Sequence, residues 1–129
     1  MSHYMTRQPW TIRKGATMAQ AHALMRKHAI RHLPVLDGGA LVGLVSERDL
    51  HLIETQPGGN PAVVTVEEAM TSDVYTVELN APIDGVVEHM AERKQGSAIV
   101  IDPHGAVLGI FTTVDALQML AEVLRKATR

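Results

Sequence analysis

The spacing of hydrophobic residues along the chain alternates between two periods, one typical of strands and one typical of helices. The same series of alternations occurs twice. Apolar residues spaced three and four apart predict helices, whereas short apolar runs between turn residues predict strands. The predicted helices cover residues 17–27 and 82–93, and the predicted strands cover residues 10–12, 33–36, 41–45, 75–77, 98–101 and 107–111. A further helix is predicted to start at Ser46 and again at Thr112. Each half therefore has the order β-α-β-β-α.

The two halves are also similar residue by residue. Met5-Thr6 matches Met70-Thr71 at an offset of 65 residues, and the segment that starts at Gly43 matches the one that starts at Gly109 at an offset of 66. A cluster of Pro, Gly and Asn at residues 56–61 lies between the copies and predicts a connecting loop. We predict a first repeat over 1–56, a linker over 57–66 and a second repeat over 67–129, which together form one compact module.

Strands that alternate with helices, with an antiparallel hairpin in each copy, predict an α+β fold. Because one copy is too small to cover both faces of its sheet, we expect the two repeats to pack through their sheets about a pseudo-twofold axis. Thr17 with Gln20 fits a helix-capping box, and Pro82 fits the first position of its helix. The apolar stripe of the last helix and the helix methionines are expected to lie mostly in the core: Leu117, Leu120, Ala121, Leu124, Met18, Met25 and Met90.

Composition excludes several classes of function. The formal net charge is −2 and no block of Lys or Arg occurs, which argues against a nucleic-acid partner and against an electrostatic membrane anchor. The chain has no cysteine, so disulfides, thiolate nucleophiles and cysteine–zinc sites are excluded. Its seven histidines lack acidic ligands at suitable spacing, and we predict no metal site. No apolar run reaches 18 residues and no signal peptide is evident, so we expect a cytoplasmic protein.

The segments Gly43-Leu44-Val45-Ser46-Glu47-Arg48-Asp49 and Gly109-Ile110-Phe111-Thr112-Thr113-Val114-Asp115 carry the candidate chemistry. Ser or Thr three residues before Asp is typical of a helix cap, and taken alone this structural interpretation is the favoured one. Here, however, both hydroxyls follow a buried strand. A helix N-terminus suits a phosphate, and a carboxylate one turn into the helix suits vicinal ribose hydroxyls. The repeated motif therefore also indicates a nucleotide site.

These two segments resemble the recurring Gly-apolar-apolar-Thr/Ser-x-x-Asp signature of cystathionine-β-synthase (CBS) domains. The segment Ala29-Ile30-Arg31-His32-Leu33-Pro34-Val35 is similar to the one that introduces the second strand of that family, and the two Met-Thr openings agree. The resemblance covers nearly the whole chain and implies a tandem CBS pair, called a Bateman module. In such pairs each of two clefts binds an adenosine compound, such as AMP, ADP, ATP or S-adenosylmethionine, and no cofactor is required.

The resemblance implies which residues contact the ligand. The cleft ranked first would use Thr11, Ala16, Ile30, Arg31, His32, Pro34, Ile110, Thr112 and Asp115. The second cleft would use Leu44, Ser46, Arg48, Asp49, Thr76, Ala81, Gln95, Gly96, Ser97 and Ile99. Each aspartate would accept hydrogen bonds from ribose, and each hydroxyl with its helix start would meet phosphate. Ile30 and Ile110 would contact the adenine.

The two implied clefts are not equivalent. Arg31 and His32 have Gly96 and Ser97 as their counterparts, and arginine is a good phosphate ligand because its charge is permanent and its donors are forked. The cleft of Asp115 is therefore expected to prefer a phosphate-bearing ligand. The cleft of Asp49 is expected to hold a less charged adenosine ligand or none.

Three classes of function remain. The favoured one is a non-catalytic sensor that binds an adenosine compound and modulates an unknown partner protein. The first alternative is a dimerisation or protein-interaction module whose clefts do not bind ligand. The second is an enzyme that acts on nucleotides, for which only His32 is a candidate base. The outer helices of CBS pairs commonly form a dimer contact, so the resemblance also implies a homodimer.

Overall fold

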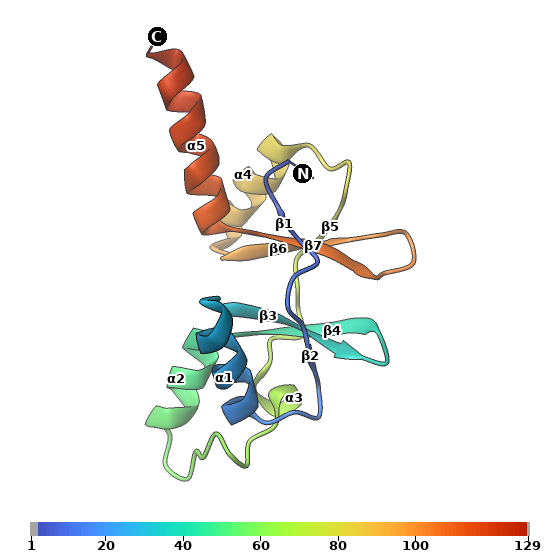
Figure 1. The fold of residues 1–129 in the computed structure, drawn as a ribbon, viewed down its shortest axis with the longest axis vertical. Coiled ribbons are helices and arrows are strands. Elements are labelled where there is room, and N and C mark those ends of the chain that lie inside the picture. Colours follow the sequence, from blue (N-terminus) through green and yellow to red (C-terminus); the bar gives the residue numbers. More distant parts are fainter. Residues whose placement is uncertain (1–2, 129) are drawn as a thin grey trace. The chain divides into compact units, whose positions relative to one another are not determined.

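The computed structural model describes residues 3–128 and has an α+β fold, as predicted (Figure 1). Each repeat contains the predicted β-α-β-β-α series, and two short elements were not predicted, β1 and α3. The elements are β1 (Thr6–Arg7), β2 (Ile12–Arg13), α1 (Met18–His28), β3 (His32–Asp37), β4 (Ala40–Ser46), α2 (Glu47–Thr55), α3 (Val66–Ala69), β5 (Thr76–Glu78), α4 (Ile83–Arg93), β6 (Ser97–Ile101), β7 (Val107–Thr112) and α5 (Thr113–Ala127). None of these helices is both long and apolar enough to cross a membrane.

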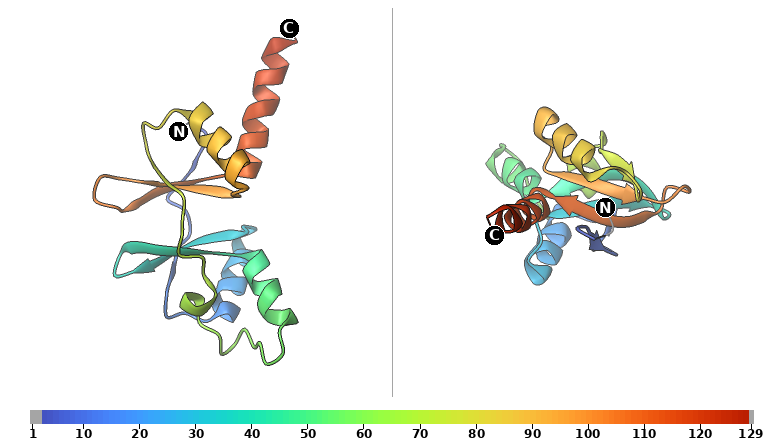
Figure 2. Two further views of the ribbon diagram at one scale, coloured as in Figure 1. Left: turned by 180° about the vertical axis from the view of Figure 1, so that it is seen from behind. Right: turned by 90° about the horizontal axis from the view of Figure 1, so that it is seen from above.

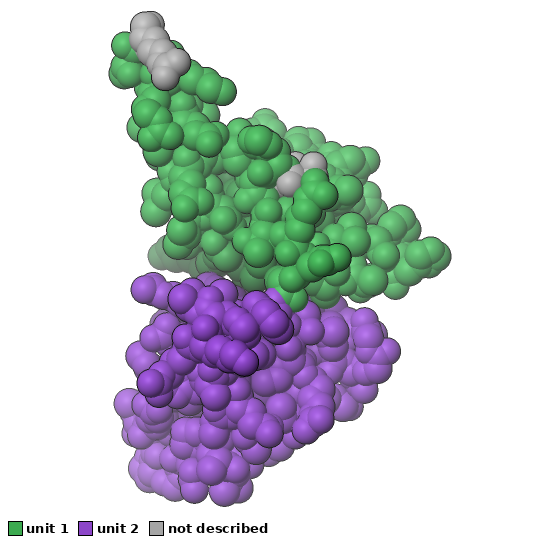
Figure 3. All heavy atoms as spheres, in the orientation of Figure 1, with its two compact units in different colours: residues 1–9, 75–129 green, residues 10–74 purple. Residues whose placement is uncertain are grey.

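The chain divides into two compact units whose limits differ from those of the sequence repeats (Figure 3). One unit combines Met1–Pro9 with Tyr75–Arg129, and the other is Trp10–Val74. Each repeat thus begins with a segment that belongs to the unit of the other repeat. Strand β1 pairs antiparallel with β7, and Thr71 forms an isolated bridge with Leu44 of β4. We call the two units by their larger segments, the 10–74 unit and the 75–129 unit.

The 10–74 unit has a three-stranded sheet of order β2-β3-β4. Strands β2 and β3 are parallel because helix α1 connects them, whereas β3 and β4 form a hairpin. Gly38 and Gly39 make its turn with positive φ angles of 58° and 89°, a backbone conformation that glycine adopts without strain. The apolar faces of the helices and the sheet form one core, which contains Met18, Met25, Leu33, Val35, Val45, Leu50 and Val66.

The 75–129 unit has a four-stranded sheet of order β1-β7-β6-β5. Its core surrounds Phe111, which is fully buried, and includes Met90 from α4. The helix methionines Met18, Met25 and Met90 are buried, as predicted. Helix α5 follows β7 directly and has 15 residues, more than any other helix of residues 3–128 (Figure 2).

In each repeated motif, the glycine lies where the strand meets the segment that comes from the other repeat. We call these two the exchanged segments: β1, which meets β7, and the segment at Thr71, which meets β4. A Cβ atom added to Gly109 would lie 2.9 Å from the carbonyl oxygen of Thr6, and one added to Gly43 would lie 3.0 Å from that of Thr71. Methionine side chains, Met5 and Met70, also lie against these glycines. Only a residue without a side chain allows this approach.

Two predictions about helices are wrong. Pro82 is the N-cap of α4 and not its first helical residue, because its ψ of 126° is extended. The stripe of α5 does not lie in the core, since no residue of this helix is buried. Leu117 and Leu120 are 64% and 48% exposed. Helix α5 follows directly from a strand of the sheet, and no other element of the unit covers its outer face. The capping box of Thr17 and Gln20 is confirmed.

Candidate functional site

Ser46 and Asp49 form a complete capping box at the start of α2. The Asp49 N–H donates to Ser46 Oγ (3.3 Å), and Asp49 Oδ2 accepts from the Ser46 N–H (2.8 Å) and hydroxyl (3.0 Å). Thr112 and Asp115 repeat this arrangement at α5 with distances of 3.4, 2.8 and 3.1 Å. The structural interpretation of the motif is therefore confirmed for both copies. In each copy Oδ2 makes the cap, and Oδ1 makes no hydrogen bond to residues 3–128. This second oxygen can accept from a ligand hydroxyl.

The loops before β3 and β6 are each hydrogen-bonded to the helix start of their own unit. The Glu47 N–H donates to the carbonyl oxygen of Arg31 (2.9 Å), and the Thr113 N–H donates to that of Gly96 (3.1 Å). His32 faces Ser46 in the sheet register, as Ser97 faces Thr112. Two of the first three helix N–H groups thus have partners in each copy. The helix starts therefore offer an anion fewer free donors than a bare helix N-terminus does.

The 10–74 unit contains ten of the predicted ligand residues: Thr11, Ala16, Ile30, Arg31, His32, Pro34, Leu44, Ser46, Arg48 and Asp49. The 75–129 unit contains the other nine: Thr76, Ala81, Gln95, Gly96, Ser97, Ile99, Ile110, Thr112 and Asp115. Strand pairing brings Thr76 beside Ile99 and Ile99 beside Ile110. Each predicted cleft draws on both units, and that combination remains a prediction.

Charged groups gather around the helix start of the 10–74 unit. Arg31 Nε lies 3.8 Å from Glu47 Oε2, and the Arg31 side chain is 81% exposed. His51 Nε2 lies 3.9 Å from the other oxygen of Glu47. Glu47 was not singled out from the sequence, because a glutamate in the first helical turn is ordinary on dipole grounds alone. In the structure its carboxylate lies near Arg31 and partly offsets the positive charge there.

His32 is held mainly neutral at neutral pH. Burial lowers its pKa below the ordinary value, and the Arg31 charge lowers it further, while Asp49 acts in the opposite direction. A neutral imidazole beside Asp49 can donate or accept a hydrogen bond but adds no charge for a phosphate.

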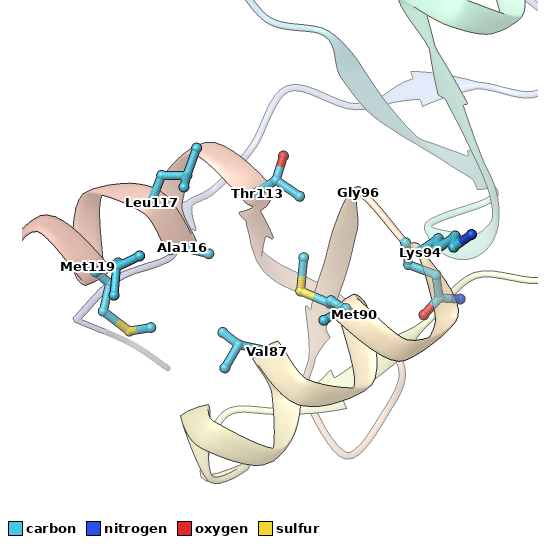
Figure 4. Close-up of a pocket in the computed structure, with 11 residues that line it drawn as sticks. Val87, Met90, Lys94, Gly96, Thr113, Ala116, Leu117 and Met119 are labelled. Atoms are coloured by element: carbon cyan, nitrogen blue, oxygen red, sulfur yellow. The ribbon is translucent and has the colours of Figure 1, made fainter.

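Each unit has a groove beside its helix start. In the 10–74 unit the groove has a volume of about 290 Å³ and is lined by His22, Met25, Arg26, Ala29, Ile30, Arg31 and Glu47. In the 75–129 unit the groove has a volume of about 600 Å³ and is lined by Val87, Met90, Ala91, Lys94, Gln95, Gly96, Thr113, Ala116, Leu117, Met119 and Leu120. Figure 4 shows that Val87, Met90, Ala116 and Met119 point toward one space between α4 and α5. Within residues 3–128, no three His, Asp or Glu side chains gather to hold a metal ion.

Comparison with known proteins gives the family. The model of the CBS domain matches residues 1–52 and 66–122, and hence both repeats. The chain belongs to the CBS domain family. A solved structure, the CBS domain pair of protein MJ0100 in complex with 5′-methylthioadenosine and S-adenosyl-L-methionine, is 28% identical with a TM-score of 0.85, and the match covers 93% of this chain and 94% of that one. This likeness confirms the CBS-pair fold inferred from the repeated motif.

Other proteins that the chain resembles are longer than it is. The L-aspartate semialdehyde sulfurtransferase of Methanocaldococcus jannaschii is 30% identical over 112 residues, which are 86% of this chain and 21% of that protein. The cytosolic domain of the Mg²⁺ channel MgtE, solved in complex with ATP, is 28% identical with a TM-score of 0.74 over 89% of this chain and 46% of that one. Among four curated relatives, the chain spans between 21% and 49% of their length. The shared part is thus the CBS pair.

Proposed function

We propose that this CBS pair is a non-catalytic sensor that binds an adenosine compound and thereby modulates a partner protein. The repeated capping box carries the proposal, because it leaves one carboxylate oxygen of Asp49 and of Asp115 free to accept from ribose hydroxyls. The solved complexes of two similar proteins, with S-adenosyl-L-methionine and 5′-methylthioadenosine in one and with ATP in the other, support an adenosine ligand.

The ligand would act by changing the population of two states of the protein. Such a shift requires that the ligand binds one state more tightly than the other. We propose the residues of the two predicted clefts as its contacts, with the aspartates at ribose and the Ser46 and Thr112 ends of the helices nearest to phosphate. Glu47 lies near only the Nε of Arg31, so the exposed guanidinium keeps its other donors for a phosphate.

The test is thermal unfolding with AMP, ADP, ATP, 5′-methylthioadenosine and S-adenosylmethionine in turn. A ligand of the native state at a hundred times its dissociation constant adds about 2.7 kcal/mol, which raises the midpoint of a domain of this size by several degrees. We expect one or more of these compounds to give this rise and Asp115→Ala or Asp49→Ala to remove it. The absence of a shift with every compound would contradict the proposal.

A matched variant separates ligand binding from helix capping. Asp115→Ala also removes one half of the capping box of α5 and destabilises the protein for that reason alone. Gln20→Ala removes the equivalent side chain from the capping box of α1, where no ligand is proposed. We expect Gln20→Ala to lower the midpoint without reducing the ligand-induced rise.

One observation favours a second function, self-association. Helix α5 carries exposed apolar side chains along its length beside an apolar groove, and such a surface usually belongs to an interface. We propose that the protein forms a homodimer through α4 and α5. A CBS pair without ligand sites would retain this activity alone.

A further inference from the structure

The chain turns at the ends of β2 and β5 with the same backbone hydrogen bond. In the 10–74 unit the Ala16 N–H donates to the carbonyl oxygen of Arg13 (3.2 Å). In the 75–129 unit the Ala81 N–H donates to that of Glu78 (3.1 Å). Strand β2 also pairs with β3 in the same register as β5 with β6. The side chains at these equivalent places can therefore be compared one by one.

In the 10–74 unit the turn after β2 supplies its own cation. Lys14 Nζ lies 3.1 Å from Asp37 Oδ2 at the end of β3 and 3.4 Å from Glu67 Oε2 of α3. The aliphatic part of such a side chain covers apolar surface while its ammonium group neutralises the carboxylates. The carboxylate at the end of β3 thus has an ammonium partner within its own unit.

In the 75–129 unit the carboxylate is kept and the cation is lost. Asp102 is the counterpart of Asp37 at an offset of 65 residues. The place of Lys14 is taken by Leu79, which is 43% exposed. The residue before it is Glu78, where the 10–74 unit has an arginine. The equivalent place has therefore changed from a balanced cluster to an acidic one beside an exposed leucine.

The carboxylate of Asp102 has one oxygen available for a ligand. Its Oδ1 accepts from the N–H groups of His104 (2.8 Å) and Ala106 (2.9 Å), which fixes the side chain in the hairpin between β6 and β7. Its Oδ2 makes no hydrogen bond to residues 3–128, and neither Asp102 nor Glu78 forms a salt bridge with them. In the other unit, Asp37 binds the lysine ammonium through Oδ2.

The two carboxylates lie on a groove whose walls are mainly apolar. The groove has a volume of about 370 Å³, and its lining includes Glu78, Leu79, Ile101, Asp102 and Leu108. This volume lies within the range of pockets that hold small ligands. Among the described residues, no Lys or Arg lines it. An aliphatic stem that ends in a positive charge is the complement of such a surface.

We propose that this groove binds a lysine or arginine side chain of a partner protein, with the cationic group at Glu78 and Asp102 and the aliphatic stem against Leu79. In the 10–74 unit the chain's own Lys14 has this role, and in the 75–129 unit the partner supplies it. The inference goes beyond the sensor proposal and does not depend on it, because the groove lies within one unit and involves no nucleotide.

The first measurement is an NMR titration of the full chain, without nucleotide, with the blocked peptide acetyl-Leu-Lys-Leu-amide. We expect saturable shifts of the amide signals of Glu78, Leu79 and Asp102. The same peptide with an acetylated lysine keeps the stem without the charge and is expected to bind about fivefold more weakly. Asp102→Asn should weaken the lysine peptide to a similar degree, since it removes the charge but keeps an oxygen for the hairpin N–H groups.

The second measurement gives the 75–129 unit the cation that the 10–74 unit has. Leu79→Lys is expected to raise the thermal midpoint by about 1–3 °C at low salt and to lose this gain in about 1 M NaCl. Its own ammonium group then occupies the groove, so binding of the lysine peptide should be abolished. The matched control Leu79→Gln has a polar side chain without the charge and is expected to show no salt-dependent gain.

Several outcomes would overturn the inference. Equal binding of the two peptides, or no saturable shift with the lysine peptide, would show that the groove does not recognise a cationic side chain. Unchanged binding to Leu79→Lys would place the peptide elsewhere on the chain. Shifts of Glu78 and Asp102 with Mg²⁺ but not with the lysine peptide would assign the groove to a metal ion instead. Because no readout involves nucleotide, these results stand whether or not the sensor proposal holds.

Discussion

The grooves beside the two helix starts occupy equivalent places in the two repeats, yet their walls differ. Arg31 and Glu47 line one groove where Gly96 and Thr113 line the other. The helices that follow also differ, since α2 has 9 residues and contacts α1, whereas α5 has 15 and buries none of them. The backbone and the caps are nevertheless alike. One repeated fold thus carries a smaller, charged groove in one unit and a larger, apolar groove in the other.

The largest expected difference between the units is in how much stability is lost when a core side chain is truncated. Phe111 and Val45 occupy equivalent positions and are both fully buried. Phe111→Ala is expected to lower the free energy of unfolding by about 3–5 kcal/mol, and Val45→Ala by roughly 1–3 kcal/mol, because the phenyl ring leaves the larger cavity. Urea unfolding followed by circular dichroism measures both. Equal losses would show that the two cores do not differ in their dependence on this position.

The motif glycines test whether the exchanged segments are held alike. Gly109→Ala and Gly43→Ala are each expected to cost about 1–3 kcal/mol, because the added methyl group meets a backbone oxygen. Exchange of the Gln8 N–H, which donates to Leu108, should accelerate in Gly109→Ala but not in Gly43→Ala. Hydrogen exchange by NMR gives this readout.

A third glycine serves as the control for these variants. Gly85 lies in α4 with open space around it, so Gly85→Ala is expected to stabilise the protein by up to about 1 kcal/mol. A stabilising effect of Gly109→Ala as well would disprove the close approach of β1.

The smallest expected effect concerns pH. Burial lowers the pKa of His32 in the folded protein, so the unfolded chain takes up the proton first as the pH falls. Above the ordinary histidine pKa near 6.5, His32 is neutral in both states and costs the folded protein no stability. As the pH drops from there toward the lowered pKa, the unfolded chain binds the proton more readily, and the free energy of unfolding falls. His32→Ser, which copies Ser97, should flatten the stability profile between about pH 7 and 5, measured by urea unfolding at each pH. A profile with the same slope in both proteins would contradict this.

Much of the candidate site could be predicted because it depends on neighbours in the chain. Ser46 and Asp49 are three residues apart, and a cap forms from that spacing alone. The exposed stripe of α5 could not be predicted, because a period of apolar residues indicates a covered face without indicating whether the cover is the same chain or another one. Glu47 was missed for a similar reason. Its significance depends on Arg31, which lies on another element.

The two β-α-β-β-α repeats, the capping boxes of α1, α2 and α5 and the membership of the CBS family follow from local spacing and from a repeated motif, so the sequence alone was enough to predict them. Only the tertiary structure decided which segment belongs to which unit, which helix N–H groups are already occupied and where an acceptor is left without a donor. Each of these depends on atoms that are distant in sequence and come within a few ångströms only when the chain folds. Gln95 is predicted from the sequence as a ligand contact, and the structure adds that its Oε1 is buried without a hydrogen-bond partner among residues 3–128.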